Sequence, residues 1–413
     1  MAWYHDLFGI DASASVATRD GERMWTSSFG PMSISGEVVT EDTSSQHWAV
    51  RACVEALCGP LSTMPLMVFE RGEGDTRKPA RDHSLYRILH DSPNRRQTSQ
   101  EYRDEQFRHL SLWRNFYAEI VPAADGSPVG QLVPIHPSRM REIKRDDTGR
   151  VYYRYTALNP GAPEIVRSED EIHHIRKAPL RADGLAGIPV WESDRETIGN
   201  AIAVDKFGSL YFRNGGTGGG VLKHPGSFKS KEDQAAFLEA WRQGGSGINR
   251  HRDRLLLHGV DYTPFTIQND EAQFLETKKQ AGYEVASIWN MPPHRVGMLE
   301  RATNNNIEQQ SIEFVVYTLA PWISGSEQAI RRDLLIGEDQ ERYFVEYNVA
   351  GLLRGDLKAR YEAYMQGRNG GWLSINDIRR LENMNPIDDG DDYLQPLNMI
   401  PAGSTPPVKE PAA

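Results

Sequence analysis

Residues 289–335 constrain the fold more than any other part of the chain. Two consecutive prolines, Pro292 and Pro293, cannot continue the preceding helix, because proline lacks a backbone N–H and its ring clashes with the previous turn. The residues that follow carry Gly297 and three consecutive asparagines, which are typical of an ordered but mobile loop. After the loop, apolar residues recur at three- and four-residue spacing on both sides of Pro321. The sequence therefore predicts a long helix that kinks at this proline.

The composition is that of a globular chain with more than one domain. With 413 residues and 39% hydrophobic content, the chain can form two or three domains with apolar cores. Its longest apolar run, residues 314–323, is far short of the ~20 residues that a membrane span needs, so we expect no membrane partner. The first residues show neither a secretory signal nor a transit peptide. The Ser-, Thr- and Gly-rich start predicts a flexible arm over residues 1–47, and the Pro/Ala-rich end predicts a disordered tail over residues 401–413.

Short helical and strand patterns alternate after the arm. Over residues 48–190 they indicate an α+β domain, because periods of 3.6 and 2 follow one another. The predicted helices of this domain span residues 48–61 and 99–113, and its predicted strands span residues 66–69, 116–121, 131–135, 140–145 and 151–156.

Two longer helical patterns enclose a small insert. Residues 191–212 predict one uninterrupted helix, which a glycine cluster stops abruptly. The second helix is predicted over residues 271–290. Within the insert we expect a strand at 221–222, a helix at 231–242 and strands at 254–257 and 262–267. The glycines of the predicted hinge are Gly215, Gly216, Gly218, Gly219 and Gly220.

No residue pattern favours catalysis. The glycines at 215–220 lack the offsets of a dinucleotide-binding loop and the G-K-[ST] ending of a phosphate loop, and they follow a helix instead of a strand. Residues 244–247 lack the final glycine of G-x-S-x-G and also follow a helix. We therefore expect neither an enzyme nor any catalytic residue.

Three other groups invite a metal-site interpretation. The aspartates of residues 388–392 supply hard oxygen ligands, but their spacing fits no EF-hand, and a solvated turn is favoured. His173 and His174 are neighbours on a strand and point to opposite faces, so they cannot both ligate one metal. Cys53 and Cys58 are predicted to be small, buried apolar residues without a disulfide. We expect no metal and no cofactor.

The stretch that begins at Trp289 resembles the portal proteins of tailed double-stranded-DNA phages. The family pattern is a helix, a P-P pair, a short loop, N-x-E-Q and an apolar helix interrupted by L-x-P-W. Two departures occur: Arg114 stands where the family commonly has glycine, and Pro189 is shifted by one place. Further elements follow in the family's order at residues 50–54, 64–66, 83–85, 92–94, 113–118, 132–137, 172–175, 184–189, 352–356 and 373–379.

The resemblance implies an α+β portal fold. Its parts are an α/β wing, a two-helix stem, a small α/β clip, a tunnel loop, a long kinked helix and a helical crown. The implied bounds are 48–190 for the wing and 337–355 for its return strand, 191–214 and 269–291 for the stem helices, 215–268 for the clip, 292–306 for the tunnel loop, 307–336 for the kinked helix and 356–400 for the crown.

The implied function is that of a ring of twelve subunits at one capsid vertex. Double-stranded DNA passes through the ring without sequence specificity during packaging and ejection. The implied partners are the major capsid protein, the terminase large subunit and the head-tail adaptor. The protein would be part of the virion and would assemble in the host cytoplasm.

The tunnel loop is expected at the narrowest part of the channel. Arg295 and Arg301 either contact DNA phosphates or pair with acidic residues of a neighbouring subunit, and the sequence leaves both roles open. Pro321 forms the expected kink, and Trp322 anchors it against the wing. The loop residues of this expected site are His294, Arg295, Val296, Gly297, Met298, Leu299, Glu300, Arg301, Thr303, Asn304, Asn305 and Asn306.

The net charge leaves the function open. With 47 basic and 57 acidic residues, the net of −10 has the wrong sign for an ordinary DNA-binding protein, whose affinity comes mostly from lysine and arginine at the phosphates. A channel must let DNA pass, so an acidic or mixed wall suits it, but solubility explains the same charge equally well. Two alternatives remain: another capsid or connector protein that conducts no DNA, and a hydrolase that uses the aspartates of residues 388–392.

Overall fold

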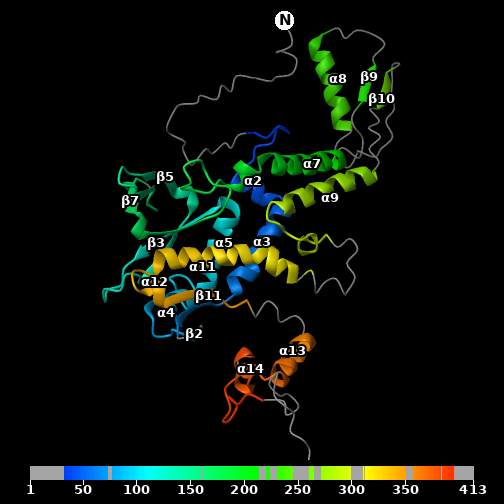
Figure 1. Cartoon of the computed structure of the whole chain (residues 1–413). Helices are drawn as coiled ribbons and strands as arrows, with labels where there is room; N and C mark the ends of the chain where they lie inside the picture. The colour runs from blue at the N-terminus through cyan, green and yellow to red at the C-terminus, as the bar shows by residue number, and fades with distance from the viewer. Residues whose placement is uncertain are drawn as a thin grey trace, which may run out of the picture.

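The structure is a computed structural model (Figure 1), and it confirms the α+β class. Helices and antiparallel sheets alternate along the chain. The residues that the structure describes are 32–72, 77–159, 161–213, 220–223, 230–244, 260–264, 271–298, 310, 312–349, 357–382 and 384–394.

Two long helices form the centre of the first domain. α3 (Trp48–Thr63) and α5 (Ser99–Trp113) pack against each other through apolar faces. α5 begins after Thr98, whose side chain accepts a hydrogen bond from the N–H of Glu101 while the Glu101 carboxylate accepts one from the N–H of Thr98. Both helices agree with the predicted spans, because each pattern is long and strongly periodic.

Three antiparallel sheets of three strands each complete this domain. β11 (Tyr343–Tyr347) follows the long helix of the central segment and pairs with β1 (Leu66–Arg71), so a late segment of the chain completes the first domain. The sheet formed by residues 140–145, 151–155 and 165–168 has its own apolar core. In spatial order the sheets are β4 (Gln131–Ile135), β3 (Asn115–Val121) and β8 (Ile172–Arg176); β11 (Tyr343–Tyr347), β1 (Leu66–Arg71) and β2 (Arg77–Pro79); and β5 (Met140–Arg145), β6 (Val151–Tyr155) and β7 (Ile165–Ser168).

Short helices connect these elements. They occur mostly at the edges of the sheets and before the longer helices. They are α2 (Glu41–Gln46), α4 (Ser84–His90), η2 (Pro137–Arg139), η3 (Glu169–Glu171), α6 (Val190–Ser193) and α12 (Asp339–Arg342).

The long helix of the central segment lies on the sheet of β3. It consists of a π-helical part, η6 (Phe314–Leu319), followed by α11 (Ala320–Leu334), and α11 packs on β8. Figure 1 shows α11 running across the first domain, where it also contacts β11. The apolar side chains of α11 join those of α3 and α5 in one core. The expected apolar stripe of this helix is therefore its buried face.

Two helices extend from this core side by side: α7 (Arg195–Arg213) and α9 (Glu271–Ser287) (Figure 1). Asp205 of α7 joins them, because its Oδ1 lies 2.9 Å from Nζ of Lys278 on α9. Its Oδ2 lies 3.4 Å from Nε2 of the buried His47. Burial lowers the pKa of His47, whereas Asp205 opposes this shift.

The insert between α7 and α9 contains a two-stranded sheet and one helix. β9 (Gly220–Lys223) pairs antiparallel with β10 (Asp261–Pro264), and α8 (Lys231–Gly244) lies beside them (Figure 1). The expected strand at 254–257 lies outside the described residues, as do four of the hinge glycines, Gly215, Gly216, Gly218 and Gly219. Gly220 is the first residue of β9.

Two helices form the carboxy-terminal unit, α13 (Leu357–Asn369) and α14 (Ile375–Leu381). The aspartate-rich residues 388–392 form a turn beside α14, as predicted. Arg380 donates to Oδ1 of Asp391 at 2.8 Å, and the N–H of Asn376 donates to the carbonyl of Gly390 at 2.8 Å. The turn is therefore held by its own helix.

Two sequence expectations are wrong. Within the predicted flexible arm, residues 41–46 form α2, and Val39 is fully buried. This segment docks on α7, where Glu37 forms an ion pair with Lys206. The predicted uninterrupted helix at 191–212 is divided at Asp194, which leaves the helical conformation between α6 and α7. In the first case tertiary contacts outweigh the local composition.

Candidate channel loop and its anchorage

The predicted tunnel loop begins with an ordered turn. Pro293–Val296 form a short 3-10 helix, η5, which packs against α3 and α9, and Gly297 ends it with a φ of 84°. Val296 is buried, and Met298 is packed against the main core. The start of the loop is thus a built part of the domain rather than an open loop. Leu299, Glu300, Arg301, Thr303, Asn304, Asn305 and Asn306 lie outside the described residues.

Gly282 makes room for the loop base. A Cβ at this position would lie 2.5 Å from Cε of Met298 and 3.0 Å from the indole ring of Trp48. Such distances are shorter than van der Waals contact, so only glycine lets these two side chains reach the surface of α9. The loop base is therefore seated between α3 and α9.

Asn290 ends the helix that precedes the loop. Its backbone is left-handed, with a φ of 50°, and asparagine tolerates this conformation better than most residues with a side chain. The N–H of Asn290 donates to the carbonyl of Ser287, and the N–H of Met291 donates to that of Ala286, both at 3.0 Å. This is a Schellman motif, which satisfies the last carbonyls of a helix. Trp289 fixes the same end, since its Nε1 donates to the carbonyl of Ser111 at 3.0 Å.

Asn290 also binds the long helix. Its Nδ2 donates to the backbone carbonyl of Tyr317 at 3.1 Å. In return, Oγ1 of Thr318 donates to the carbonyl of Asn290 at 2.7 Å. The residue that precedes the loop is therefore joined to the π-helical segment by two hydrogen bonds of opposite direction.

The irregularity of the long helix begins before Pro321. The N–H of Ala320 donates to the carbonyl of Val315, five residues back, so η6 is π-helical where a simple proline kink was expected. Pro321 itself lies in the first turn of α11, directly after the π-helical segment. Trp322 is buried as predicted, and Nζ of Lys177 lies 4.1 Å from its ring centroid. Burial lowers the pKa of Lys177 to about 8.

Arg295 reaches the same segment. Its guanidinium carbon lies 4.6 Å from the ring centroid of Phe314, which is a cation–π contact, while the side chain remains exposed to solvent. A DNA contact and a contact to a neighbouring subunit both stay predictions for this residue. Beside it, burial lowers the pKa of His294, and Arg295 adds to this shift.

The two adjacent histidines lie in different environments, as their opposite faces require. Nδ1 of His173 lies 2.8 Å from Oδ2 of Asp333 on α11, and Arg332 donates to the carbonyl of His174 at 2.6 Å. Burial alone would raise the pKa of Asp333, but hydrogen bonds from His173 and Arg332 bring it to about 2. This pair fixes α11 on β8.

His174 is fully enclosed. Its Nε2 lies 3.2 Å from Oδ1 of Asn115, and the hydroxyl of Tyr153 lies 3.2 Å from its Nδ1. Because the amide oxygen can only accept, His174 carries its proton on Nε2 and is neutral. Burial lowers its pKa to about 3, with Arg176 as a further cause. Both histidines thus serve packing.

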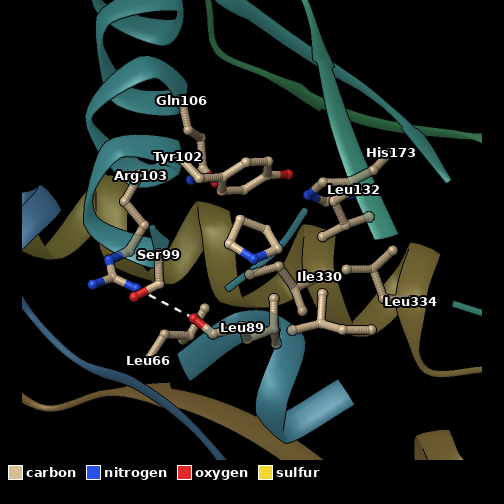
Figure 2. Close-up of a pocket in the computed structure, with 12 residues that line it drawn as sticks. Leu66, Leu89, Ser99, Tyr102, Arg103, Gln106, Leu132, His173, Ile330 and Leu334 are labelled. Carbon is tan, nitrogen blue, oxygen red and sulfur yellow. Dashed lines mark hydrogen bonds between the residues drawn. The ribbon is translucent and has the colours of Figure 1, made fainter. Parts of the chain in front are cut away.

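Two hollows border α5. A closed cavity between α5 and α11 measures about 10 Å³, which is close to the space of one water molecule, and Figure 2 shows Tyr102, Gln106 and His173 around it. An open hollow of about 390 Å³ lies over α5, where Arg108 is paired with Asp104 at 2.6 Å. Across the described residues, no group of three or more His, Cys, Asp or Glu is placed to hold a metal. The helices of this part of the chain are also too short or too polar to cross a membrane.

Sequence reasoning missed Asn290 and Thr318. The local signal for Asn290 was its place directly before Met-Pro-Pro at the end of a helical pattern, where a left-handed cap is common. No local signal pairs it with Thr318, because the partners are 28 residues apart.

Comparisons with known proteins agree on one family. The model of the phage portal protein family matches residues 48–383. The probable portal protein of Streptomyces phage phiC31 is 30% identical over 426 residues, which cover 98% of this chain and 91% of that protein. The portal protein of Enterobacteria phage HK97 is 28% identical over 394 residues, which cover 93% of this chain and 91% of that protein.

Solved structures share the fold. A crystal structure of an HK97 family phage portal protein from Corynebacterium diphtheriae gives a TM-score of 0.56 at 15% identity, covering 78% of this chain and 99% of that one. The neck of a native gene transfer agent particle, computed with C12 symmetry, gives a TM-score of 0.53 at 19% identity, covering 89% of this chain and 97% of that one.

Proposed function

The chain belongs to the phage portal protein family, and from this we propose that it forms the ring at the single portal vertex of a phage capsid. The ring is the conduit through which double-stranded DNA is packaged and ejected. The observation that carries this proposal is the family match over residues 48–383, which includes both stem helices and the base of the channel loop.

A closed ring of twelve copies is the proposed assembly. The similarity to the gene transfer agent neck computed with C12 symmetry supports this number. Each copy in such a ring contacts its two neighbours through two different surfaces, and the rotation between successive copies closes the ring. The assembled ring is a component of the virion, put together in the host cytoplasm before the capsid is filled.

The parts of the chain take the roles of a portal subunit. The first domain is the wing, α7 and α9 are the stem, the insert with α8 is the clip, and α13 with α14 belongs to the crown. The clip's two-stranded sheet supports this role, because its short strands leave edges that an adjacent copy can complete. We place the terminase large subunit and the head-tail adaptor at the clip, and the major capsid protein around the wing.

The channel role rests on positioning and involves no chemistry. The start of the loop, residues 293–298, is packed on α3 and α9 and gives the loop a fixed base. Arg301 is proposed to contact DNA phosphates or an acidic side chain of the next copy. The proposed function of the chain is structural, and portal proteins are in general structural proteins.

Imaging the purified, assembled protein tests this proposal directly. We expect closed rings with an axial hole in electron micrographs, and DNA-filled particles when the ring is supplied to an assembly reaction. A solid disc, or a ring whose hole is closed by the wing, would overturn the conduit and leave a connector without a channel.

Arg301→Glu then tests the contact within the channel. The exchange reverses one charge, so packaging velocity or DNA retention should change while ring size stays constant. Glu300→Gln is the matched control, since it alters the neighbouring charge without introducing repulsion. Unchanged packaging by the Arg301 variant would exclude a DNA contact at that residue.

A further inference from the structure

The proline in the long helix leaves one carbonyl without its helical donor. In an α-helix the carbonyl of Tyr317 would accept from the N–H four residues later, which is position 321. Pro321 has no N–H, and Nδ2 of Asn290 takes that place at 3.1 Å. A side chain from the end of α9 thus completes the hydrogen bonding of a different helix.

We propose that Asn290 is a positioning residue of the channel loop, which holds the π-helical register of η6 and thereby couples the two ends of the loop. The inference rests on the proposed function of residues 292–306. The loop begins shortly after Asn290, and the described chain resumes just before η6, so Asn290 is joined to the segments on both sides of the loop.

Three contacts make this coupling. Asn290 donates to the carbonyl of Tyr317, Thr318 donates to the carbonyl of Asn290, and the guanidinium of Arg295 lies over Phe314. All three reach η6 from the residues that flank the start of the loop. A displacement of the loop start therefore acts on η6 directly.

The register of η6 controls the direction of the loop's second end. A π-helical turn holds one more residue than an α-helical turn, and each residue of a helix accounts for about 100° of rotation and about 1.5 Å of rise. If η6 became α-helical while α11 stayed in place, the residues before Phe314 would turn by about this amount. Since those residues connect the loop to η6, the direction in which the loop enters the helix would change.

Asparagine can both end α9 and donate the hydrogen bond to Tyr317. Its backbone tolerates the left-handed conformation that ends α9, and its amide supplies the donor. Glycine would keep the backbone conformation without the donor. Aspartate would keep the shape, but its carboxylate would face the carbonyl of Tyr317 with no proton to donate.

A double-mutant cycle with Pro321 tests the inference. Asn290→Gly removes the donor, so amide hydrogen exchange in peptides covering residues 312–322 should become about 3- to 10-fold faster, as expected for one lost hydrogen bond. Pro321→Ala restores an N–H that can donate to Tyr317. In that background, Asn290→Gly should change the exchange by less than about 2-fold.

Two further variants separate this role from general loss of structure. Asn290→Asp should speed amide exchange as much as Asn290→Gly does, because neither side chain donates a hydrogen bond to the carbonyl of Tyr317. Thr318→Val removes the hydrogen bond from Thr318 to Asn290. It should speed amide exchange in residues 312–322 by the same factor with and without Pro321→Ala. An equal effect of Asn290→Gly in both backgrounds would overturn the inference.

The exchange measurements need only the purified, folded full chain, so they are independent of ring assembly and of DNA transport. In reconstructions, rings of Asn290→Gly should keep their symmetry while the loop is displaced from its parent position. Rings that package DNA but show no coupling in the cycle would sink only this inference. Coupling in a protein that forms no ring with an axial hole would instead sink only the proposed function.

Discussion

Asn115 and Gly187 are joined by two reciprocal hydrogen bonds. The N–H of Gly187 donates to Oδ1 of Asn115 at 2.7 Å, and Nδ2 of Asn115 donates to the carbonyl of Gly187 at 2.9 Å. Both residues belong to sequence elements that resemble the portal family, 113–118 and 184–189. The pair therefore brings two separate family elements together at the end of β3.

Gly187→Ala should strongly destabilise the first domain. A Cβ here would lie 2.4 Å from the carbonyl oxygen of Arg114 and 2.7 Å from that of Lys177. Backbone atoms cannot turn away as a side chain can, so we expect a loss of about 3 kcal/mol or more in the free energy of unfolding. Urea denaturation of the purified chain measures it.

Gly325→Ala is the matched control. Gly325 lies in α11, and a Cβ there meets no atom within 4 Å. Alanine should therefore raise stability by about 0.5–1 kcal/mol through its helix propensity. If both variants lost the same free energy of unfolding, the steric argument for Gly187 would be contradicted.

Two buried histidines should make the protein sensitive to mild acid. Burial lowers the pKa of His109 and of His174 to about 3 from a usual value of 6.5. The unfolded chain then binds more protons between pH 6.5 and 3, so this stability is fully present above pH 6.5 and is lost as the pH falls. We expect a slope of up to about 1.4 kcal/mol per pH unit for each histidine.

Denaturation midpoints between pH 7 and 4.5 measure this slope. His174→Gln should reduce the slope whatever it does to the stability at pH 7, because glutamine does not titrate. A slope that is the same in the parent and in His174→Gln would show that other groups cause the acid sensitivity.

Asp333→Asn should weaken the contact of α11 with β8. The carboxylate accepts from His173 and Arg332 in a mostly buried site, so we expect a loss of about 2–4 kcal/mol. Asp339→Asn is the control, because Asp339 pairs with His83 at the surface and should matter by less than about 1 kcal/mol. Thermal unfolding at neutral pH compares the two.

The acid window of Asp333 differs from that of the histidines. Its folded-state pKa is about 2, below the usual value of 3.8, so its contribution is present above pH 3.8 and is lost as the pH falls toward 2. Any difference between the parent and Asp333→Asn should therefore shrink below pH 3.8. A constant difference down to pH 2 would contradict the assigned ion pair.

Both cysteines should be unreactive in the folded protein. Burial raises the pKa of Cys53 and of Cys58 to about 12, so almost no thiolate exists at pH 8. A maleimide reagent should label neither thiol in native protein and both in urea, as mass spectrometry of the intact chain would show. One label on the native protein would mean that α3 opens locally.

The sequence was most informative where a strong period coincides with a long element. The patterns at 48–61 and 99–113 gave α3 and α5, and those at 131–135 and 140–145 gave β4 and β5, because burial on one face determines both period and structure. The left-handed conformation of Arg114, with a φ of 58°, agrees with its place at a family glycine.

The missed features depend on contacts between distant residues. The composition around residue 41 is that of a disordered arm, yet Thr40 and Thr43 form a capping box and Val39 enters the core. The π-helical register of η6 leaves no trace in the spacing of apolar residues, and its contact with Asn290 joins residues 27 positions apart. The helix break at Asp194 and the strand β7 also lacked a period long enough to detect.

The docking of residues 32–46 has a practical meaning for trimming this protein. The family match starts at Trp48, and a shortened gene would naturally begin there. Such a chain would lose Glu41, which accepts from Nε1 of Trp113 at 2.9 Å, and Glu196 would lose the N–H of Ile34, which it accepts at 2.8 Å. It would also uncover the apolar surface that Val39 fills. The start of the family match and the start of the folded domain differ, and an expressible fragment should retain everything from Met32 onward.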